Sequence, residues 1–376
     1  MRRENSGEMF SSFFKEKRVL VTGHTGFKGA WLSLWLRHLG AKVFGISLPP
    51  PTAPNLHELI NNHVFTREIT CDTRDLERLA PAILATDPEV IFHLAGQAIS
   101  RRSYQEPLET FQTNVNGTLN VLESVRRARL NSVVIVITSD KCYENREWEF
   151  AYRENDALGG HDVYSMSKAA AELATQAWKK SFFLTDPKLG PVATVRAGNV
   201  IGGGDYAPDR IVPDCVRALI RGEAIQVRNP SATRPWQHVL ACLSGYLWLA
   251  VRLHQEPNIS ASWGGTFNFG PDGSGRQTVG TLVQEFLKSW PGKWIDASDP
   301  KAPHEAKLLS LSIEKAGALL GWYPCWTFAQ TVQQTAAWYY QRHVAGDPNI
   351  LQLSIRQIED YSEVARAKSL AWAASA

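Results

Sequence analysis

Short apolar runs alternate with longer amphipathic stretches along the chain from residue 18 onward. The apolar runs lack strict alternation with polar residues, which predicts strands buried on both faces of a sheet. These strands are predicted at 18–22, 42–47, 64–69, 89–94, 132–138 and 192–197. The amphipathic stretches predict helices at 28–40, 73–86, 107–129 and 161–182. Elements in this order predict an α/β fold of the Rossmann type, a doubly wound parallel sheet covered by helices on both faces.

The regular alternation weakens after residue 198, where Gly, Pro and Trp become frequent. Polar, loop-rich sequence on a rigid scaffold is where binding groups concentrate. We therefore expect a flexible tail at 1–14, a Rossmann domain at 15–198 and a smaller, loop-rich substrate domain at 199–376. The segment around 234–270 is expected to return to the Rossmann domain.

Charge and cysteine content argue against several classes of partner and cofactor. The chain has 40 basic and 37 acidic residues, and its net charge of +3 steers it toward neither nucleic acid nor membrane. Its 5 cysteines are scattered and lack a CxxC or Cys/His metal spacing, which predicts reduced thiols in a cytoplasmic protein and no metal site. No apolar run reaches the ~18 residues of a membrane span.

A glycine-rich turn, TGHTGFKG, follows the first predicted strand directly. Gly23, Gly26 and Gly29 have a GxxGxxG spacing, so bare backbone can approach a pyrophosphate at the start of the next helix. Glycines also serve plain turns, but a turn between a strand and an amphipathic helix favours a dinucleotide site.

The choice between NAD and NADP depends on the end of the second strand. A carboxylate there would bind the ribose diol and repel a 2′-phosphate, but the sequence has Ser47 followed by Leu48 and three prolines. No arginine suited to a 2′-phosphate replaces the acid, so we predict NAD. Asp72 after the third strand can accept from the adenine amino group, and its alternative role is the N-cap of helix 73–86.

Tyr164 and Lys168 form a YxxxK motif at the start of helix 161–182. The i, i+4 spacing places the phenol and the ammonium on one helical face. A nearby cation lowers the pKa of a tyrosine, which makes the tyrosine a base for a sugar hydroxyl. The alternative is a surface pair, because this motif occurs by chance in many helices.

Strand 132–138 ends in an acid and a base, Asp140 and Lys141, which follow Thr138 and Ser139. A carboxylate beside an ammonium at a strand end is either an acid–base pair for catalysis or a structural ion pair.

With these motifs in place, the chain resembles the extended short-chain dehydrogenase/reductases that act on nucleotide sugars. The matching motifs are TGHTGFKG (22–29), HLAGQ (93–97), NVNGTLNVLE (114–123), YSMSK (164–168) and RAGNVIGGGD (196–205). Within this family it is most similar to the CDP-glucose 4,6-dehydratases, through GHTGFKGAWLSLWL (23–36), GISLPPPTAPNLHE (45–58), the stretch 139–173 and RPWQHVLACLSGYL (234–247). The resemblance covers about residues 14–361.

The resemblance implies a reaction, the dehydration of CDP-D-glucose to CDP-4-dehydro-6-deoxy-D-glucose with NAD as cofactor. Tyr164, supported by Lys168, would take the 4-hydroxyl proton while the C4 hydride passes to NAD. Ser139 would hydrogen-bond the 4-oxygen, and Asp140 would protonate the leaving 6-hydroxyl. Lys141 stands where related dTDP-glucose dehydratases have a glutamate, so it would be the C5 base. It can take that proton only if it is itself neutral for part of the cycle.

The resemblance also implies which residues bind the cofactor and the substrate. The cofactor residues are Gly23, Thr25, Gly26, Phe27, Lys28, Gly29, Asp72, Leu94, Ala95, Gln97, Asn114, Tyr164 and Lys168. The substrate residues are Arg101, Asn199, Asp205, Arg210, Arg234 and His238. A guanidinium suits bidentate phosphate contacts, although Arg210 has a solvated alternative and His238 could instead pack near Trp236.

Helices 107–129 and 161–182 are long and amphipathic, and in this family such a pair forms the four-helix bundle of a homodimer. The family's products feed deoxysugar synthesis for surface polysaccharides such as the O-antigen of lipopolysaccharide. Three alternatives stay open: a 4-epimerase, a 4,6-dehydratase for another nucleotide hexose, and a non-catalytic nucleotide-sugar regulator. Asp140 and Lys141 argue against the epimerase, which needs no acid or base for elimination.

Overall fold

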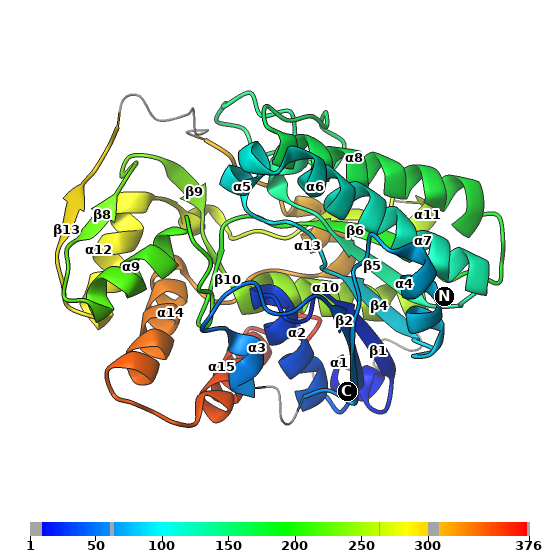
Figure 1. Cartoon of the computed structure of the whole chain (residues 1–376), viewed down its shortest axis with the longest axis horizontal. Coiled ribbons are helices and arrows are strands. Elements are labelled where there is room, and N and C mark those ends of the chain that lie inside the picture. The colour runs from blue at the N-terminus through cyan, green and yellow to red at the C-terminus, as the bar shows by residue number, and fades with distance from the viewer. Residues whose placement is uncertain (1–9, 61–63, 263, 300–307, 374–376) are drawn as a thin grey trace.

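The computed structural model describes residues 10–60, 64–262, 264–299 and 308–373. Within these residues a seven-stranded sheet in the order β11-β6-β5-β4-β1-β2-β3 forms the centre, and every neighbouring pair is parallel (Figure 1). Its strands are β1 (Arg18–Thr22), β2 (Lys42–Ser47), β3 (Arg67–Thr70), β4 (Val90–His93), β5 (Val133–Ile137), β6 (Val192–Arg196) and β11 (Thr266–Asn268). The predicted Rossmann-type fold is confirmed.

Helices pack on both faces of this sheet and also form part of the region after residue 198. They are α1 (Phe10–Phe14), α2 (Phe27–His38), α3 (Leu56–Ile60), α4 (Leu76–Leu84), α5 (Ser100–Gln105), α6 (Pro107–Phe111), α7 (Gly117–Ala128), α8 (Val163–Trp178), α9 (Ile211–Ile220), α10 (Val239–Gln255), α11 (Ile259–Ser262), α12 (Val279–Ser289), α13 (Glu314–Leu320), α14 (Phe328–His343) and α15 (Ile350–Ala367). A π-helical turn at Gln112–Asn116 joins α6 to α7, and another at Lys179–Phe183 continues α8. In Figure 1, α4, α7 and α8 lie on one side of the sheet and α2, α10 and α15 on the other.

Successive strand residues belong to two different cores, as expected for a sheet buried on both faces. Val19 and Val21 of β1 pack in the core that includes α2 and α10, whereas Leu20 packs in the core that includes α4 and α7. The same alternation in β5 places Ile135 in the first core and Val134 in the second. This two-sided burial explains the continuous apolar runs in the sequence.

The predicted elements lie close to the observed ones. Strands 18–22 and 42–47 match β1 and β2 residue for residue, whereas β3 begins at Arg67, three residues after its predicted start. Helix 107–129 is present as α6, the π-helical turn and α7. Beyond residue 198, Thr266–Asn268 adds β11 to the edge of the central sheet beside β6.

The predicted flexible tail at 1–14 is wrong for its last five residues, while residues 1–9 lie outside the described residues. Phe10, Phe13 and Phe14 of α1 are buried, and Phe10 contacts Trp35 of α2 and Trp372 near the C-terminus. Burying a phenylalanine contributes about 1.5–3 kcal/mol, which holds this short helix in place.

Three small two-stranded sheets carry the polar loops after residue 198. They pair β7 (Val200–Ile201) with β10 (Gln237–His238), β9 (Thr233–Pro235) with β12 (Arg276–Thr278), and β8 (Ile225–Val227) with β13 (Trp294–Asp296). The last two sheets lie with α9, α12 and α14 on the left of Figure 1. Among the described helices, none has the length and apolar character needed to cross a bilayer.

Candidate active site

The glycine-rich turn lies where the strand order of the sheet reverses, between β1 and β4. The crevice at such a switch point is where open α/β sheets bind ligands. Gly23 has φ +72°, and a Cβ there would lie 2.6 Å from the backbone nitrogen of Ala95 after β4. A Cβ on Gly29 would lie 2.2 Å from the carbonyl oxygen of Gly23. Glycine is therefore needed at both positions to close the turn.

The start of α2 fits the pyrophosphate of a dinucleotide. A Cβ on Gly26 would meet only the carbonyl oxygen of Gly23, at 3.4 Å, so the space beside Gly26 is otherwise open. Gly26 is the N-cap of α2, and no side chain caps the first N–H groups of the helix. Free N–H groups and the helix dipole favour an anion at this end.

The end of β2 presents hydroxyl groups in place of a carboxylate. Oγ1 of Thr25 donates to the carbonyl oxygen of Leu48 at 2.9 Å and lies 2.8 Å from Oγ of Ser47. Asp72 holds Arg74 through contacts of 2.6–3.1 Å, and the Arg74 hydrogen bond lowers the pKa of Asp72. The alternative role of Asp72, as N-cap of the following helix, is wrong, because Asp75 caps α4.

Asn114 and Gln97 join the loop after β4 to the helices above it. The amide hydrogens of Asn114 go to the carbonyl oxygen of Gln97 at 3.1 Å and to Oγ of Ser167 at 2.8 Å. Its Oδ1 accepts from the backbone N–H of Gln97 at 2.9 Å, and Gln97 itself donates to Thr110. Both residues therefore shape the loop that carries Leu94 and Ala95.

Tyr164 and Lys168 are both buried on one face of α8. Burial raises the pKa of Tyr164 to about 12, and a hydrogen bond with Ser139 offsets only part of this effect. The expected lowering of the Tyr164 pKa by a neighbouring cation is thus not found, because desolvation outweighs it. Burial, with a smaller contribution from the charge of Lys28, lowers the pKa of Lys168 to about 8.

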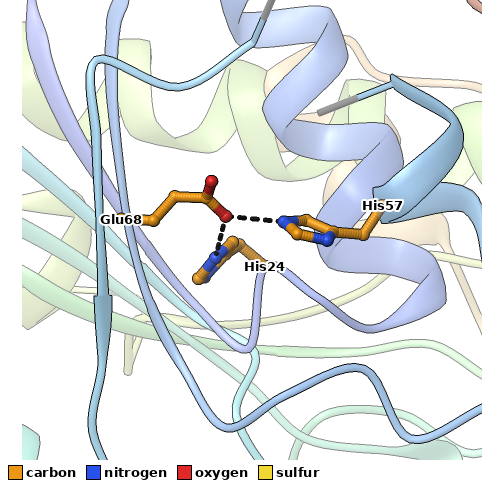
Figure 2. A group of neighbouring side chains, drawn as sticks. All are labelled: His24, His57 and Glu68. Atoms are coloured by element: carbon orange, nitrogen blue, oxygen red, sulfur yellow. Dashed lines mark hydrogen bonds and ion pairs between the residues drawn. The ribbon is translucent and has the colours of Figure 1, made fainter. Parts of the chain in front are cut away.

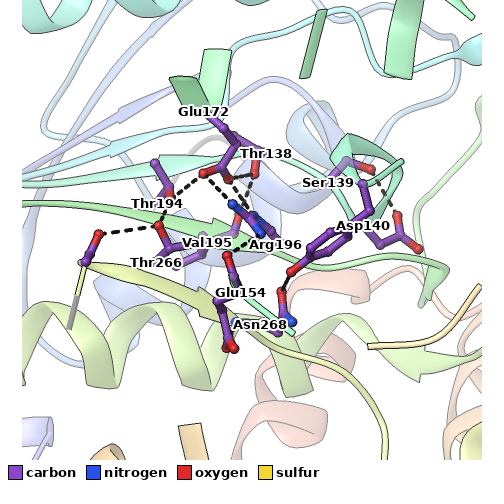
Figure 3. A network of polar contacts seen from close by, with 12 residues as sticks. Thr138, Ser139, Asp140, Glu154, Glu172, Thr194, Val195, Arg196, Thr266 and Asn268 are labelled. Carbon is purple, nitrogen blue, oxygen red and sulfur yellow. Dashed lines mark hydrogen bonds and ion pairs between the residues drawn. The ribbon is translucent and has the colours of Figure 1, made fainter. Parts of the chain in front are cut away.

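Figure 3 shows the carboxyl of Asp140 beside Ser139. Its Oδ1 accepts from Oγ of Ser139 at 3.0 Å, while its Oδ2 is buried and has no partner among the described residues. A Cβ on Gly198 would lie 1.7 Å from Oδ2, so only glycine admits the carboxyl here. We call the group of Ser139, Asp140, Tyr164 and Lys168 the open site, because Oδ2 of Asp140 has no partner among the described residues.

Lys141 follows Asp140 but lies at the surface. The short 3-10 helix Asp140–Cys142 carries it, and Oγ of Ser139 accepts its backbone N–H at 3.2 Å. Its side chain is exposed, and Nζ lies 5.9 Å from the centre of the Tyr164 ring. Lys141 is therefore beside the open site, and only a bound ligand could exclude water from it.

A second set of polar groups lies beneath the open site and was not predicted. Glu172 forms a buried ion pair with Arg196 at 3.0 Å and accepts from Oγ1 of Thr138 at 2.5 Å and of Thr194 at 2.7 Å (Figure 3). These four residues are called the closed network below. The sequence contains a signal for Glu172, because this residue follows Lys168 by four positions and lies on the same helical face.

Comparison with known proteins places the chain in a family. A model of the GDP-mannose 4,6 dehydratase family matches residues 20–335. A CDP-glucose 4,6-dehydratase of Salmonella typhimurium is 43% identical over 357 residues, which is 93% of this chain and 97% of that relative. The chain belongs to the GDP-mannose 4,6-dehydratase family.

Other members and folds are more distant. A dTDP-glucose 4,6-dehydratase of Escherichia coli is 24% identical, covering 86% of this chain and 92% of the relative. The crystal structure of a dTDP-glucose 4,6-dehydratase from Bacillus anthracis, in complex with NAD, has a TM-score of 0.70 at 21% identity and covers 88% of this chain and 99% of its own. A UDP-glucose 4-epimerase from Thermotoga maritima, with UDP-glucose, has a TM-score of 0.71 at 21% identity, covering 86% and 98%. The fold is thus shared by dehydratases and epimerases.

Four of the six residues predicted to bind substrate in this dehydratase-family chain lie on the loops that follow β6 and on α5. Arg210 pairs with buried Asp205 at 2.9 Å, and its charge acts on Tyr164, which places it near the open site. Nη1 of Arg101 on α5 lies 3.5 Å from Oδ1 of Asp209 on the same loop. Asn199 has φ +49°, a left-handed conformation that turns the chain directly after Gly198.

The other two predicted substrate residues lie farther along the chain, on β9 and β10. Arg234 on β9 is half-buried and donates to the carbonyl oxygen of Thr233. His238 is buried, accepts the backbone N–H of Leu240 as the N-cap of α10, and packs against Trp326 with ring centres 4.8 Å apart. Burial lowers the pKa of His238 to about 3. These contacts support packing for His238, but its partner is Trp326 and not the predicted Trp236, and its buried Nε2 has no partner among the described residues.

Proposed function

We propose that this protein is a hydro-lyase that dehydrates CDP-D-glucose to CDP-4-dehydro-6-deoxy-D-glucose and water, with NAD as its cofactor. The observation that carries the proposal is the carboxyl of Asp140, buried beside Ser139 with Oδ2 unpartnered among the described residues. A 4-epimerase has no use for such an acid, because its substrate loses no oxygen. The 43% identity to the Salmonella relative supports CDP-glucose as the substrate.

The turn at Gly23–Gly29 would hold the pyrophosphate of NAD, and the loop of Leu94 and Ala95 would border its other half. When bound, NAD would take the C4 hydride and return it to C6, and its positively charged nicotinamide ring would favour the phenolate of Tyr164. Lys28 and Lys168, which already act on each other electrostatically, would face this ring and the ribose.

The residues of the open site and the neighbouring Lys141 divide the proton transfers. Tyr164 takes the proton of the 4-hydroxyl, and Ser139 holds the 4-oxygen by a hydrogen bond. Lys141 takes the proton from C5, which the new 4-ketone has made acidic, and gives it back to C5 when the hydride returns to C6. Asp140 gives its proton to the 6-hydroxyl, which leaves as water. Because burial keeps bulk water away from Asp140, its proton is available only to a group that enters the site.

The loops after residue 198 would hold the nucleotide diphosphate. Arg210, oriented by Asp205, and Arg234 would bind phosphate oxygens, and Asn199 would bind the phosphate next to the sugar. In this view residues 15–198 bind the cofactor and 199–376 mainly bind the substrate, while β11 and α10 return to the central sheet.

The test is incubation of the purified protein with CDP-glucose, and with dTDP-, UDP- and GDP-glucose in parallel. We expect a 4-keto sugar, seen by its ultraviolet absorbance in alkali, and loss of one water by mass spectrometry, with CDP-glucose alone. A product of unchanged mass would replace the proposal by epimerisation. Turnover of a different nucleotide sugar would keep the dehydration and overturn the substrate.

We further propose a homodimer that pairs α6, α7 and α8 with their copies. Large apolar side chains are exposed on two of these helices: Leu108 of α6 is 76% exposed, and Leu173 and Met166 of α8 are 60% and 39% exposed. Contiguous exposed apolar residues mark association surfaces. Leu173→Glu should give a monomer by light scattering, whereas Ile220→Glu, at the exposed end of α9, should leave a dimer. A wild-type monomer would overturn this assignment.

A further inference from the structure

Three residues far apart in the chain converge beside the glycine-rich turn, and the proposed dehydration uses none of them. His24 lies in the turn, His57 on α3 and Glu68 on β3. Figure 2 shows both imidazole rings directed at one carboxylate. Nε2 of His24 lies 2.9 Å from Oε1 of Glu68, and Nε2 of His57 lies 2.6 Å from the same oxygen.

The pocket that holds these rings is built into the fold. The side chains of His24 and His57 are 3% and 8% exposed, whereas that of Glu68 is 31% exposed. A Cβ on Gly45 of β2 would come within 2.6 Å of the His24 ring, so the glycine makes room for the imidazole. The ring of Phe65 covers both imidazoles, at 4.8 and 5.5 Å between centres. One side of the cluster, at Glu68, faces solvent.

The hydrogen bonding of the cluster is incomplete. One carboxylate oxygen serves two imidazoles, and Nδ1 of His24 and Nδ1 of His57 are buried without partners among the described residues. These Nδ1 atoms are not the atoms that face Glu68, so the case for a bound ion rests on the convergence of both Nε2 atoms on one carboxylate oxygen. The contrast with the fully paired Glu172 shows that this fold can satisfy a buried carboxylate when only structure is required.

We propose that His24, His57 and Glu68 bind a divalent transition-metal ion of the zinc class, with water as the fourth ligand. Two imidazoles and a carboxylate form a donor set that Zn²⁺ takes in tetrahedral geometry. The three ligand atoms already lie within 4.8 Å of one another. Metal–ligand distances of about 2.0–2.2 Å separate tetrahedral ligand atoms by roughly 3.3 Å, so the present contacts of 2.9 and 2.6 Å would open by about 0.4 and 0.7 Å, and the two Nε2 atoms, now within 4.8 Å of each other, would take the same spacing. The partly exposed Glu68 can make this movement.

The ion would link the glycine-rich turn to α3 and β3. His24 stands between Gly23 and Thr25, so its coordination would fix the turn against α3 and β3. The local spacing of the sequence could not reveal this set, because His57 and Glu68 lie on separate elements from the turn. The sequence analysis therefore expected no metal. The role inferred is structural support of the turn and does not depend on the dehydration chemistry.

The test measures zinc bound to protein purified without a histidine tag, after incubation with Zn²⁺ and gel filtration. We expect about one zinc per chain in the wild type. Glu68→Gln and His57→Gln should each retain almost none. The matched control is His38→Gln, because His38 on the surface of α2 also faces a carboxylate, Glu359, at 3.8 Å. This control should keep the wild-type amount.

Two further measurements separate a built site from loose binding. Co²⁺ in place of Zn²⁺ should give the visible absorption of four-coordinate cobalt in the wild type and not in Glu68→Gln. Saturating Zn²⁺ should raise the Tm of the wild type by about 5 °C and leave that of Glu68→Gln unchanged. A wild type that retains no zinc, or a Glu68→Gln variant that retains as much as the wild type, overturns the inference. An active enzyme that retains no zinc after this incubation would overturn this inference alone, and a zinc-binding protein that turns over no nucleotide sugar would overturn the dehydratase proposal alone.

Discussion

Lys168 and Glu172 lie one turn apart on the same face of α8, and both are buried, yet their surroundings differ. Glu172 accepts hydrogen bonds from Thr138, Thr194 and Arg196, so both of its oxygens are occupied. Lys168 has no carboxylate partner within the described part of the chain, and burial lowers its pKa to about 8. One helix thus connects the closed network to the open site.

The difference teaches how to separate structural from functional groups among buried polar residues. A group whose partners are complete holds its neighbours in place, and its loss is a loss of stability. A group left incomplete costs stability in the free protein and is available to a ligand. By this criterion the closed network positions the ends of β5 and β6, whereas we propose that the open site acts on the substrate.

The largest expected effect is on turnover, from Asp140→Asn in the open site. The amide has the shape of the carboxyl but cannot protonate the leaving 6-hydroxyl, so kcat should fall about 10²–10⁴-fold. C4 oxidation does not need this proton, so the absorbance of reduced nicotinamide should build up after mixing with CDP-glucose.

The free energy of unfolding of Asp140→Asn should stay within about 1 kcal/mol of the wild type, because Oδ2 has no partner to lose. Denaturant titration measures the free energy of unfolding, and stopped-flow absorbance measures the build-up of reduced nicotinamide. A variant that turns over at the wild-type rate would remove Asp140 from the mechanism.

The largest expected effect on stability comes from Glu172→Gln in the closed network. The change leaves the guanidinium of Arg196 buried without its countercharge, which should lower the free energy of unfolding by about 3–5 kcal/mol. Glu123→Gln is the control, because Glu123 also pairs with two arginines but at the surface of α7, where loss of an ion pair costs at most about 1 kcal/mol. Urea titrations of both variants measure the difference. Equal losses would show that the closed network has no special structural weight.

The pH dependence of the stability of Lys168→Met tests whether burial of Lys168 in the open site lowers the free energy of unfolding. The folded protein lowers the pKa of Lys168 from 10.5 to about 8, so between these values the unfolded chain binds the proton and the folded chain does not. Wild-type stability therefore rises with pH across this window. Below pH 8 the variant should be more stable than the wild type, by up to ~3 kcal/mol, and the gap should close above it. Denaturant titrations of both proteins on each side of pH 8 measure the gap, and a constant gap would contradict the assignment.

The parts of this molecule that the sequence predicts are those set by local pattern. The strands 18–22 and 42–47 can be predicted because burial on both faces leaves a continuous apolar run. The glycine turn and the YxxxK motif can be predicted because their residues are close together in the sequence. The space for the Asp140 carboxyl depends on Gly198, which lies beside the carboxyl only because β5 and β6 are neighbours in the sheet. No local pattern contains that contact.

The same reasoning explains the errors. Helix α1 is held by contacts with residues such as Trp372 near the other end of the chain, so its sequence alone read as a tail. The depth of burial, which sets the pKa of Tyr164, depends on everything packed around α8 and not on the spacing to Lys168. The structure of α1 and the pKa of Tyr164 are both determined by packing in the folded core, which the local sequence does not show.

The smallest and sharpest effect comes from two adjacent residues that face the two regions. Thr138→Val removes one of the hydrogen bonds to Glu172 and should cost about 1–2 kcal/mol of unfolding free energy, with kcat changed less than about twofold. Ser139→Ala removes the hydroxyl beside Tyr164 and Asp140 and should lower kcat about 10- to 100-fold, with little change in stability. Measuring both quantities for both variants gives four values. If stability and turnover fell together in each variant, the boundary between the closed network and the open site would not lie between residues 138 and 139.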